Sequence, residues 1–454
     1  MSVGDKRGGR STVDRAVAGE FASGGVGLRI RSLRRAAGMS QSELADGRFS
    51  KEYVSQVERG KARPTRETLE WLAGRLATDR EYLEAGVSRS DAQRVDGALR
   101  NAELLVESHR YEDALVAFGE SAQLVDAVAT RAYSLRRLTG EAWARIRIGD
   151  LAGATSALEE AAALAASEEC SDVDRANVLF LRGVCRYSAS SITEATALFD
   201  DALTIAERSQ LPCDGLRSDI FQWRSRCHRR ERDWLAARED AERALELAEA
   251  LPDRRRAADA YFQASLVAQR EGRWVLARTN AERSKALFEE LGDRATVGRL
   301  LNNLAGINHL LGSPPRAIAL LGEAFEIFVE LGLDVEAGYV SSSLADIYVD
   351  SGDHEQAEVQ ARRALGLLAG RVDHLQEVGT AQLALGRALV AQGKLSEAEE
   401  LIATADRIFE RANSLSHRSD AWIARGDLAT NRGEHSEAAR QYRRAARALL
   451  DTHD

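Results

Sequence analysis

Apolar residues near the amino-terminal end of the chain recur at spacings of three and four, the period of helices that bury one face. Four apolar groups follow one another between residues 25 and 85, three of them with this spacing. The groups are Ile30 and Leu33 within residues 28–37, Leu44 and Ala45 after Ser40, Val54 and Val57 within residues 50–58, and Leu69, Leu72, Ala73 and Leu76 after Thr65. This segment is therefore predicted to form a small bundle of short helices.

Residues with the chemistry of helix ends bound two of these helices. Ser40 and Glu43 have the spacing of a capping box, in which each side chain bonds the other residue's backbone amide. Gly47 interrupts the first of the two helices, Ser50 is a good N-cap for the second, and Gly60 ends it. Two short helices across a tight turn are the result. The polar face of the second helix carries Lys51, Glu52, Ser55 and Gln56.

From residue 91 onward the chain carries a repeat of about forty residues. A small residue opens the second helix of each expected hairpin, at steps of 40 to 42 residues. These residues are Ala114, Ala154, Ala195, Ala237, Ala277, Ala317, Ala357, Ala398 and Ala438. Five residues before six of them stands a glycine, where the turn between paired helices is expected. A period of this length held over nine units predicts a helical solenoid.

The charge of the chain is unevenly distributed. The whole chain has 62 Lys and Arg against 71 Asp and Glu, but residues 1–80 have 16 basic and 10 acidic side chains. A basic end on an acidic body fits contact with DNA at one end. The alternative interpretation is that this modest excess of basic residues arose by chance and has no role in DNA contact.

Residues 38–64 resemble the Cro/CI-type helix-turn-helix of the XRE regulators. The matching positions are Ser40-Gln41, Leu44-Ala45, Phe49-Ser50, the run from Val54 to Glu58, Gly60 and Pro64. The turn departs from the family pattern, since Asp46-Gly47-Arg48 is one residue short. The resemblance implies base reading by Lys51, Glu52, Ser55 and Gln56, and phosphate contacts by Gln41, Ser50, Lys61 and Arg63. The chemistry agrees, because Gln pairs with adenine, Lys with guanine and Glu with cytosine in the major groove. The alternative is a solvated polar face.

The repeats resemble tetratricopeptide repeats, with Phe118, Phe199 and Tyr442 where that family has its aromatic residue. The combined architecture is similar to the RRNPP peptide-sensing regulators. The resemblance implies an all-α fold, a small helix-turn-helix bundle followed by a right-handed α-solenoid of about nine TPR-like helical hairpins. It also implies a peptide or protein ligand on the concave face, lined by the first helix of each hairpin. The candidate ligand residues are Gln222, Arg226, Asn302 and His309, and Asn302 could instead be an ordinary polar surface residue.

The expected organisation is a disordered arm over residues 1–24, a DNA-binding domain over 25–85, a linker over 86–90 and the solenoid over 91–454. No phosphate-binding loop, nucleophile elbow or metal-ligand spacing is present in the sequence, so we expect no enzyme, no cofactor and no metal. The four cysteines form no C-x-x-C pair, and no apolar run is long enough to span a bilayer. A cytoplasmic location is therefore expected.

These features predict a sequence-specific DNA-binding transcriptional regulator whose solenoid senses a peptide or protein partner and sets the oligomeric state. A homodimer on double-stranded DNA is expected. The alternative is a TPR interaction scaffold with a vestigial or tethering helix-turn-helix head.

Overall fold

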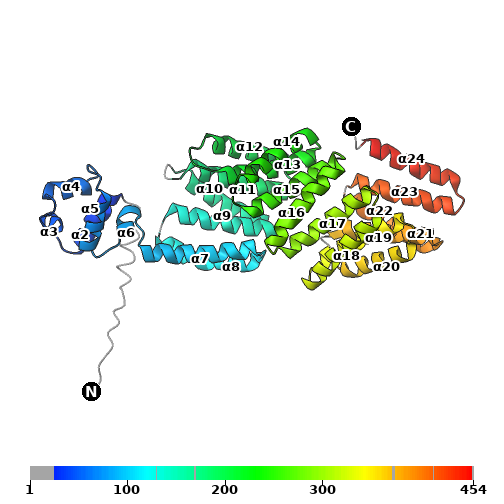
Figure 1. Cartoon of the computed structure of the whole chain (residues 1–454), viewed down its shortest axis with the longest axis horizontal. Helices are drawn as coiled ribbons and strands as arrows, with labels where there is room; N and C mark the ends of the chain where they lie inside the picture. Colours follow the sequence, from blue (N-terminus) through cyan, green and yellow to red (C-terminus); the bar gives the residue numbers. More distant parts are fainter. Residues whose placement is uncertain (1–24, 129, 168–169, 371–373, 413, 452–454) are drawn as a thin grey trace, which may run out of the picture. The chain divides into compact units, whose positions relative to one another are not determined.

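The computed structural model describes residues 25–128, 130–167, 170–370, 374–412 and 414–451, so the expected arm over residues 1–24 lies outside the described residues. Within these ranges the regular structure is helical, with no β-strand (Figure 1). The chain divides into two compact units, Met1–Cys227 and His228–Asp454, and each is described by itself below. The all-α prediction is confirmed.

Five short helices form the amino-terminal bundle, which we call the head. They are α2 (Val26–Ala36), α3 (Gln41–Ala45), α4 (Lys51–Glu58), α5 (Arg66–Arg75) and α6 (Arg80–Ala85). Its core is one apolar cluster that runs from Ile30 to Leu83 and includes Val54 and Val57. The apolar positions noted in the sequence are buried in this cluster, except Leu33, which is partly buried and packs against it.

The caps that delimit these helices are present. The Ser40 hydroxyl accepts from the Glu43 amide at 3.1 Å, and the Ser40 amide donates to the Glu43 carboxylate at 2.6 Å. The Ser50 hydroxyl accepts from the Tyr53 amide at 3.1 Å, which fixes the start of α4. Between α3 and α4, Asp46 and Gly47 both adopt positive φ, so the chain turns sharply there despite the shortened turn sequence.

Long helices follow the head in successive pairs. In the first unit they are α7 (Arg89–Glu107), α8 (Tyr111–Val128), α9 (Arg131–Ile148), α10 (Leu151–Ala165), α11 (Asp172–Ser188), α12 (Ile192–Arg208) and α13 (Asp214–Glu231), whose last residues belong to the second unit. In the second unit they are α14 (Trp234–Glu249), α15 (Arg254–Arg270), α16 (Trp274–Glu290), α17 (Arg294–Leu310), α18 (Pro314–Glu330), α19 (Asp334–Asp350), α20 (His354–Leu367), α21 (Leu375–Ala391), α22 (Leu395–Arg411), α23 (Leu415–Asn431) and α24 (His435–Asp451). None of the described helices is long and apolar enough to cross a membrane.

The small residues of the repeat lie where paired helices cross. The nine alanines that open the second helices are buried, from 0% exposure at Ala114 to 5% at Ala438. Two serines at the equivalent crossings add hydrogen bonds: Ser265 donates to the carbonyl of Ala277, and Ser284 to the carbonyl of Ala258, each at 2.8 Å. Small side chains allow this close approach of backbones, which explains why the repeat keeps them.

The turn within each hairpin needs a residue whose backbone adopts the left-handed conformation, with positive φ. Six repeats place glycine there, with φ between 72° and 85°. The other three have His109, Ser190 and Arg232 at the same position, and all three also adopt positive φ, from 58° to 65°. The geometry of the turn is therefore kept where the glycine is absent, at a cost in backbone strain.

Aromatic residues fill two positions of the repeat. Phe118 and Phe199, expected from the sequence, are fully buried, whereas Tyr442 in the last helix is 37% exposed. Later repeats use a second position seven residues further along, where Phe288, Phe328 and Phe409 are all buried. This second position was not predicted.

Candidate DNA-reading and ligand-binding sites

Helix α4 presents the polar face that the sequence predicts. Val54 and Val57 are 3% and 2% exposed and hold one side of the helix against the core. The side chains on the other side are those of Lys51, Glu52 and Gln56, which are exposed, and Ser55, which is partly exposed. Base-reading side chains must be free to enter a groove, and Lys51, Glu52 and Gln56 meet that requirement.

Position and orientation of α4 are set by a buried polar network. Arg34 of α2 donates to both carboxylate oxygens of Glu58 at the end of α4, with Nε 2.5 Å from Oε1 and Nη2 3.1 Å from Oε2. Gln41, at the start of α3, donates its Nε2 to Glu58 Oε2 at 2.8 Å. Burial opposes ionisation of Glu58, but the hydrogen bonds from Arg34 and Gln41 outweigh it and hold the pKa of Glu58 below its usual range.

This network gives Gln41 a structural contact that the sequence did not reveal. Its amide connects α3 to α4 in the free protein, so its role as a phosphate contact stays a prediction. Gly27 reveals a second constraint on α4: a Cβ at this position would lie 2.1 Å from the carbonyl oxygen of Val57. The amino-terminal end of α2 therefore approaches the end of α4 too closely for any side chain.

Cationic side chains lie on and beside the polar face of α4. In the described part of the chain, Lys51, Lys61 and Arg63 are exposed and take part in no ion pair. Arg59, which the sequence reasoning missed, donates to the hydroxyl and the carbonyl of Ser55 and so covers part of the predicted face. The position of Arg59 directly after α4 is the sequence feature that could have indicated this contact.

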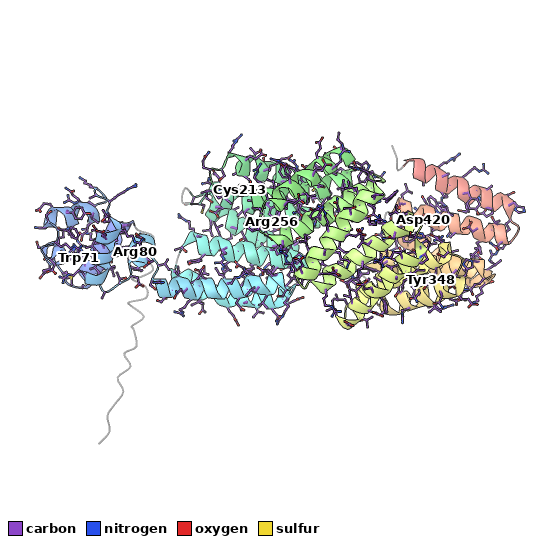
Figure 2. All side chains as sticks on the ribbon, viewed as in Figure 1. Trp71, Arg80, Cys213, Arg256, Tyr348 and Asp420 are labelled. Carbon is purple, nitrogen blue, oxygen red and sulfur yellow. The ribbon has the colours of Figure 1, made fainter. Side chains whose placement is uncertain are left out.

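Behind this face, an aromatic cluster supports the shortened turn. The ring of Phe49 meets Trp71 of α5 edge-on, with centroids 5.2 Å apart (Trp71 is labelled in Figure 2). Arg48 and Arg75 lie over the Trp71 ring, at 5.8 and 5.9 Å from its centroid. The turn between α3 and α4 is thus fixed by side chains of α5.

In the solenoid, the first helices of successive pairs contact one another, α7 with α9 and α9 with α11 in the first unit, and α17 with α19, α19 with α21 and α21 with α23 in the second. Helices α7, α9 and α11 thus form one layer, and α17, α19, α21 and α23 form another. The predicted ligand residues all lie on helices of this kind, Gln222 and Arg226 on α13, and Asn302 and His309 on α17.

On α13 the two candidates have different surroundings. Gln222 is 4% exposed and its amide faces the Ser218 hydroxyl at 3.5 Å, which makes it a packed residue. Arg226 lies 4.2 Å from the ring centroid of Trp223. That indole meets Trp143 and Tyr187 edge-on, at centroid distances of 6.2 and 5.4 Å. Arg226 therefore belongs to a partly exposed aromatic group contributed by three first helices.

On α17 the two candidates retain unused hydrogen-bonding atoms. Asn302 Oδ1 is buried and has no hydrogen-bond partner among the described residues. His309 shares a hydrogen bond between Nε2 and Asp350 Oδ2 at 3.2 Å, while its buried Nδ1 has none in the same part of the chain. The neighbouring Asn303 also has a buried Oδ1 without a partner in these ranges, but its Nδ2 is engaged and donates to Gln269 Oε1 at 3.1 Å. Asn302 and His309 thus lie on the layer with polar atoms available to a ligand.

Charged residues that the sequence reasoning missed lie beside His309. Arg387 of α21 donates to Asp350 Oδ1 at 2.8 Å and approaches Asp346 Oδ1 at 3.4 Å. Asp346 and Arg387 each directly follow the small crossing residue of their repeat, so register alone could have placed them on this face. Burial raises the pKa of Asp346 to about 7; Asp350 and Asp420 act in the same direction, and Arg387 and His309 oppose them.

Two family models match segments of the chain. Residues 30–83 match a helix-turn-helix family, and residues 256–329 and 296–369 match tetratricopeptide repeats. The protein therefore combines a helix-turn-helix domain with a carboxyl-terminal tetratricopeptide-repeat solenoid, as the sequence predicted. No curated protein matches the chain significantly.

Solved structures share this fold at low sequence identity. The apo form of RapI is 14% identical, with a TM-score of 0.60 over 79% of this chain and 98% of that one. The quorum sensor NprR from B. thuringiensis is 12% identical, with a TM-score of 0.57 over 79% of this chain and 99% of that one. The Rap conjugation gene regulator of the plasmid pLS20, in complex with the Phr* peptide, is 11% identical, with a TM-score of 0.50 over 79% of this chain and 95% of that one.

Proposed function

We propose that this protein is a sequence-specific DNA-binding transcriptional regulator whose solenoid senses a peptide or protein partner. The observation that carries the proposal is α4, a helix held rigidly by Val54, Val57 and the Glu58 network, with Lys51, Glu52 and Gln56 exposed on its outer face. A rigid element that carries hydrogen-bonding side chains is what major-groove reading requires. Lys61 and Arg63, in the loop after α4, supply charge for the phosphates.

The sensing half of the proposal is supported by the layer of first helices. It carries polar atoms without partners at Asn302 and His309, and an amide can hold an extended peptide backbone through paired donor and acceptor atoms. One protein of similar fold is described in complex with a peptide. A ligand there would change the DNA affinity only if it binds one shape of the solenoid more tightly than another. Small changes at each joint between repeats would add up to such a difference in shape.

We further propose that the protein binds DNA as a homodimer. One head carries few base-reading side chains, and two heads on a two-fold axis would read half-sites about one helical turn apart. The solenoid would then set the spacing of the heads.

Selection of bound fragments from a pool of random duplexes by the purified full chain tests the proposal. We expect enrichment of a two-fold-symmetric sequence, with an affinity that falls steeply as salt rises because lysine and arginine displace counterions from phosphates. A lack of enrichment, with salt-insensitive or no binding, would refute DNA reading and favour the interaction scaffold with a tethering head. A single unsymmetrical half-site bound by a monomer would refute the dimer alone.

A further inference from the structure

The second unit contains a cluster of charged side chains from four successive first helices. We call His309 of α17, Asp346 and Asp350 of α19, Arg387 of α21 and Asp420 of α23 the inner-face cluster (Asp420 is labelled in Figure 2). Asp350 accepts from Arg387 and shares a hydrogen bond with His309, so α17, α19 and α21 are joined there. The side chains of His309 and Arg387 are 26% and 33% exposed, so a ligand can reach the cluster.

Negative charge exceeds positive charge within this cluster. Three carboxylates, those of Asp346, Asp350 and Asp420, lie around the single guanidinium of Arg387, and the imidazole of His309 is the one other basic group of the cluster. Burial is the main reason that the pKa of Asp420 is raised, as it is for Asp346. Carboxyl groups with raised pKa values are groups whose ionised form lacks compensation. A further cation placed among these carboxylates would compensate their negative charge.

Two hydrogen-bonding groups without partners border the cluster. Ser342 lies one helical turn before Asp346 on α19, so the two side chains share a face. Ser342 is 5% exposed, and its buried Oγ has no hydrogen-bond partner in the described ranges. The same holds for Oδ1 of Asn302 on the adjacent α17. Buried polar groups usually have a partner, so these two atoms are free to bond to a ligand.

We propose that the inner-face cluster binds a cationic group of an extended peptide, either a lysine or arginine side chain or the free amino terminus. Asp346, Asp350 and Asp420 would surround the cation, and Ser342 and Asn302 would bond to the adjacent peptide backbone. This inference rests on the proposed sensing function and adds the charge of the ligand to it.

A purely structural role fits these observations less well. A network that only joined neighbouring repeats would gain most from matched charges, as in the exposed pair between Arg362 and Glu397. Here the carboxylates outnumber the cation, and the neutral groups beside them are left unsatisfied. Such an arrangement costs stability in the free protein and is compensated when a complementary ligand binds.

The experiment uses the purified full chain and a library of random heptapeptides in two forms, one with a free amino terminus and one acetylated. We expect enrichment of peptides with lysine or arginine in the acetylated library. If the terminal ammonium is the cation, enrichment appears only in the free library. Replacing the selected cation by norleucine or an acetyl cap should weaken binding to the wild-type protein about tenfold, a loss of about 1.4 kcal/mol.

Two isosteric variants, Asp346→Asn and Asp350→Asn, should show a similar loss for the cationic peptide and little change for its neutral analogue. Glu323→Gln, an exposed position on the second helix α18, removes the same charge away from the cluster and should change neither affinity. Enrichment of neutral or acidic peptides would overturn the cation site and leave peptide sensing intact. Enrichment of no peptide in either library would overturn both the cation site and the sensing of peptides.

Discussion

Arg34 and Glu58 form a bidentate ion pair between α2 and the end of α4, and their side chains are only 10% and 2% exposed. An ion pair of this kind holds two elements in one relative position, because either partner left alone is a buried charge. A residue of α2, outside the predicted reading set, therefore helps to fix the orientation of the predicted DNA surface.

Arg34→Met should destabilise the head by about 3–5 kcal/mol, since Glu58 is then buried without its counterion. Hydrogen exchange of the full chain measures this locally: the amides of α2 and α4 should exchange faster while those of the second unit do not change. Arg66→Ala is the control, because its pair with Glu70 is exposed and contributes about 0–1 kcal/mol. Unchanged exchange in α4 of Arg34→Met would contradict this prediction.

Substitutions on α4 should separate base reading from phosphate binding. Lys51→Ala and Gln56→Ala are each expected to cost about 1–3 kcal/mol on the selected sequence and to relax preference at one base position. Arg63→Ala should weaken binding to all sequences alike and reduce the salt slope by about one. Titration of the selected duplex and of single-base variants measures both effects. Unaltered specificity in the two helix variants would rule out these reading residues.

The left-handed turn residues offer a stabilising substitution. Ser190 is exposed and has a φ of 62°, a conformation that costs a residue with a side chain about 1–2 kcal/mol. Ser190→Gly should therefore raise the free energy of unfolding of the first unit by about 1 kcal/mol in urea denaturation. Ala189→Gly, one residue earlier with a φ of −78°, should lower it instead. The prediction fails if both glycines have the same effect.

Asp346 should make the stability of the second unit depend on pH near neutrality. Its pKa of about 7 in the folded protein exceeds the value of about 3.9 for an ordinary aspartate, so the folded state holds this proton more tightly. The resulting stabilisation is complete below about pH 4 and is lost as the pH rises to about 7. His309, Asp350, Arg387 and Asp420 all act on this carboxyl group, so the size of the effect depends on them.

Because Asp346→Asn removes the ionisation, its stability relative to the wild type should be more favourable at pH 8 than at pH 5. Arg387 keeps its bond to Asp350 in this variant. Urea denaturation at the two pH values, with Glu323→Gln as the charge-matched control, measures the difference. An equal difference at both pH values would show that Asp346 does not titrate in this range.

Asn302→Ala should leave the fold and the basal DNA affinity intact but abolish the response to a peptide ligand. In the free protein its Oδ1 makes no hydrogen bond that the substitution could remove. DNA affinity is measured for both proteins with and without peptides selected by the wild type, or with cell extract. Asn303→Ala is the matched control: it loses the bond to Gln269, at a cost of about 1 kcal/mol, but should still respond. An equal response from Asn302→Ala would refute the sensing role.

Sequence alone determined the helices of the head and the repeating hairpins, because both depend on residues within one or two helical turns. Ser40 and Glu43 cap a helix that begins between them, and Val54 and Val57 share a face whatever they pack against. The small residues at steps of 40 to 42 specify where helices may cross, so the solenoid follows from their period.

Tertiary structure decided which polar groups meet. Arg34 and Glu58 are 24 residues apart, and Asp350 is 41 residues from His309 and 37 from Arg387. Gln41 bonds to Glu58 from one helix away, which no local pattern indicates. The burial, the pairing and the raised pKa of Asp346 arise because packing brings several helices together. The period of the repeat sets the register of those helices, but it does not specify which charged side chains face each other.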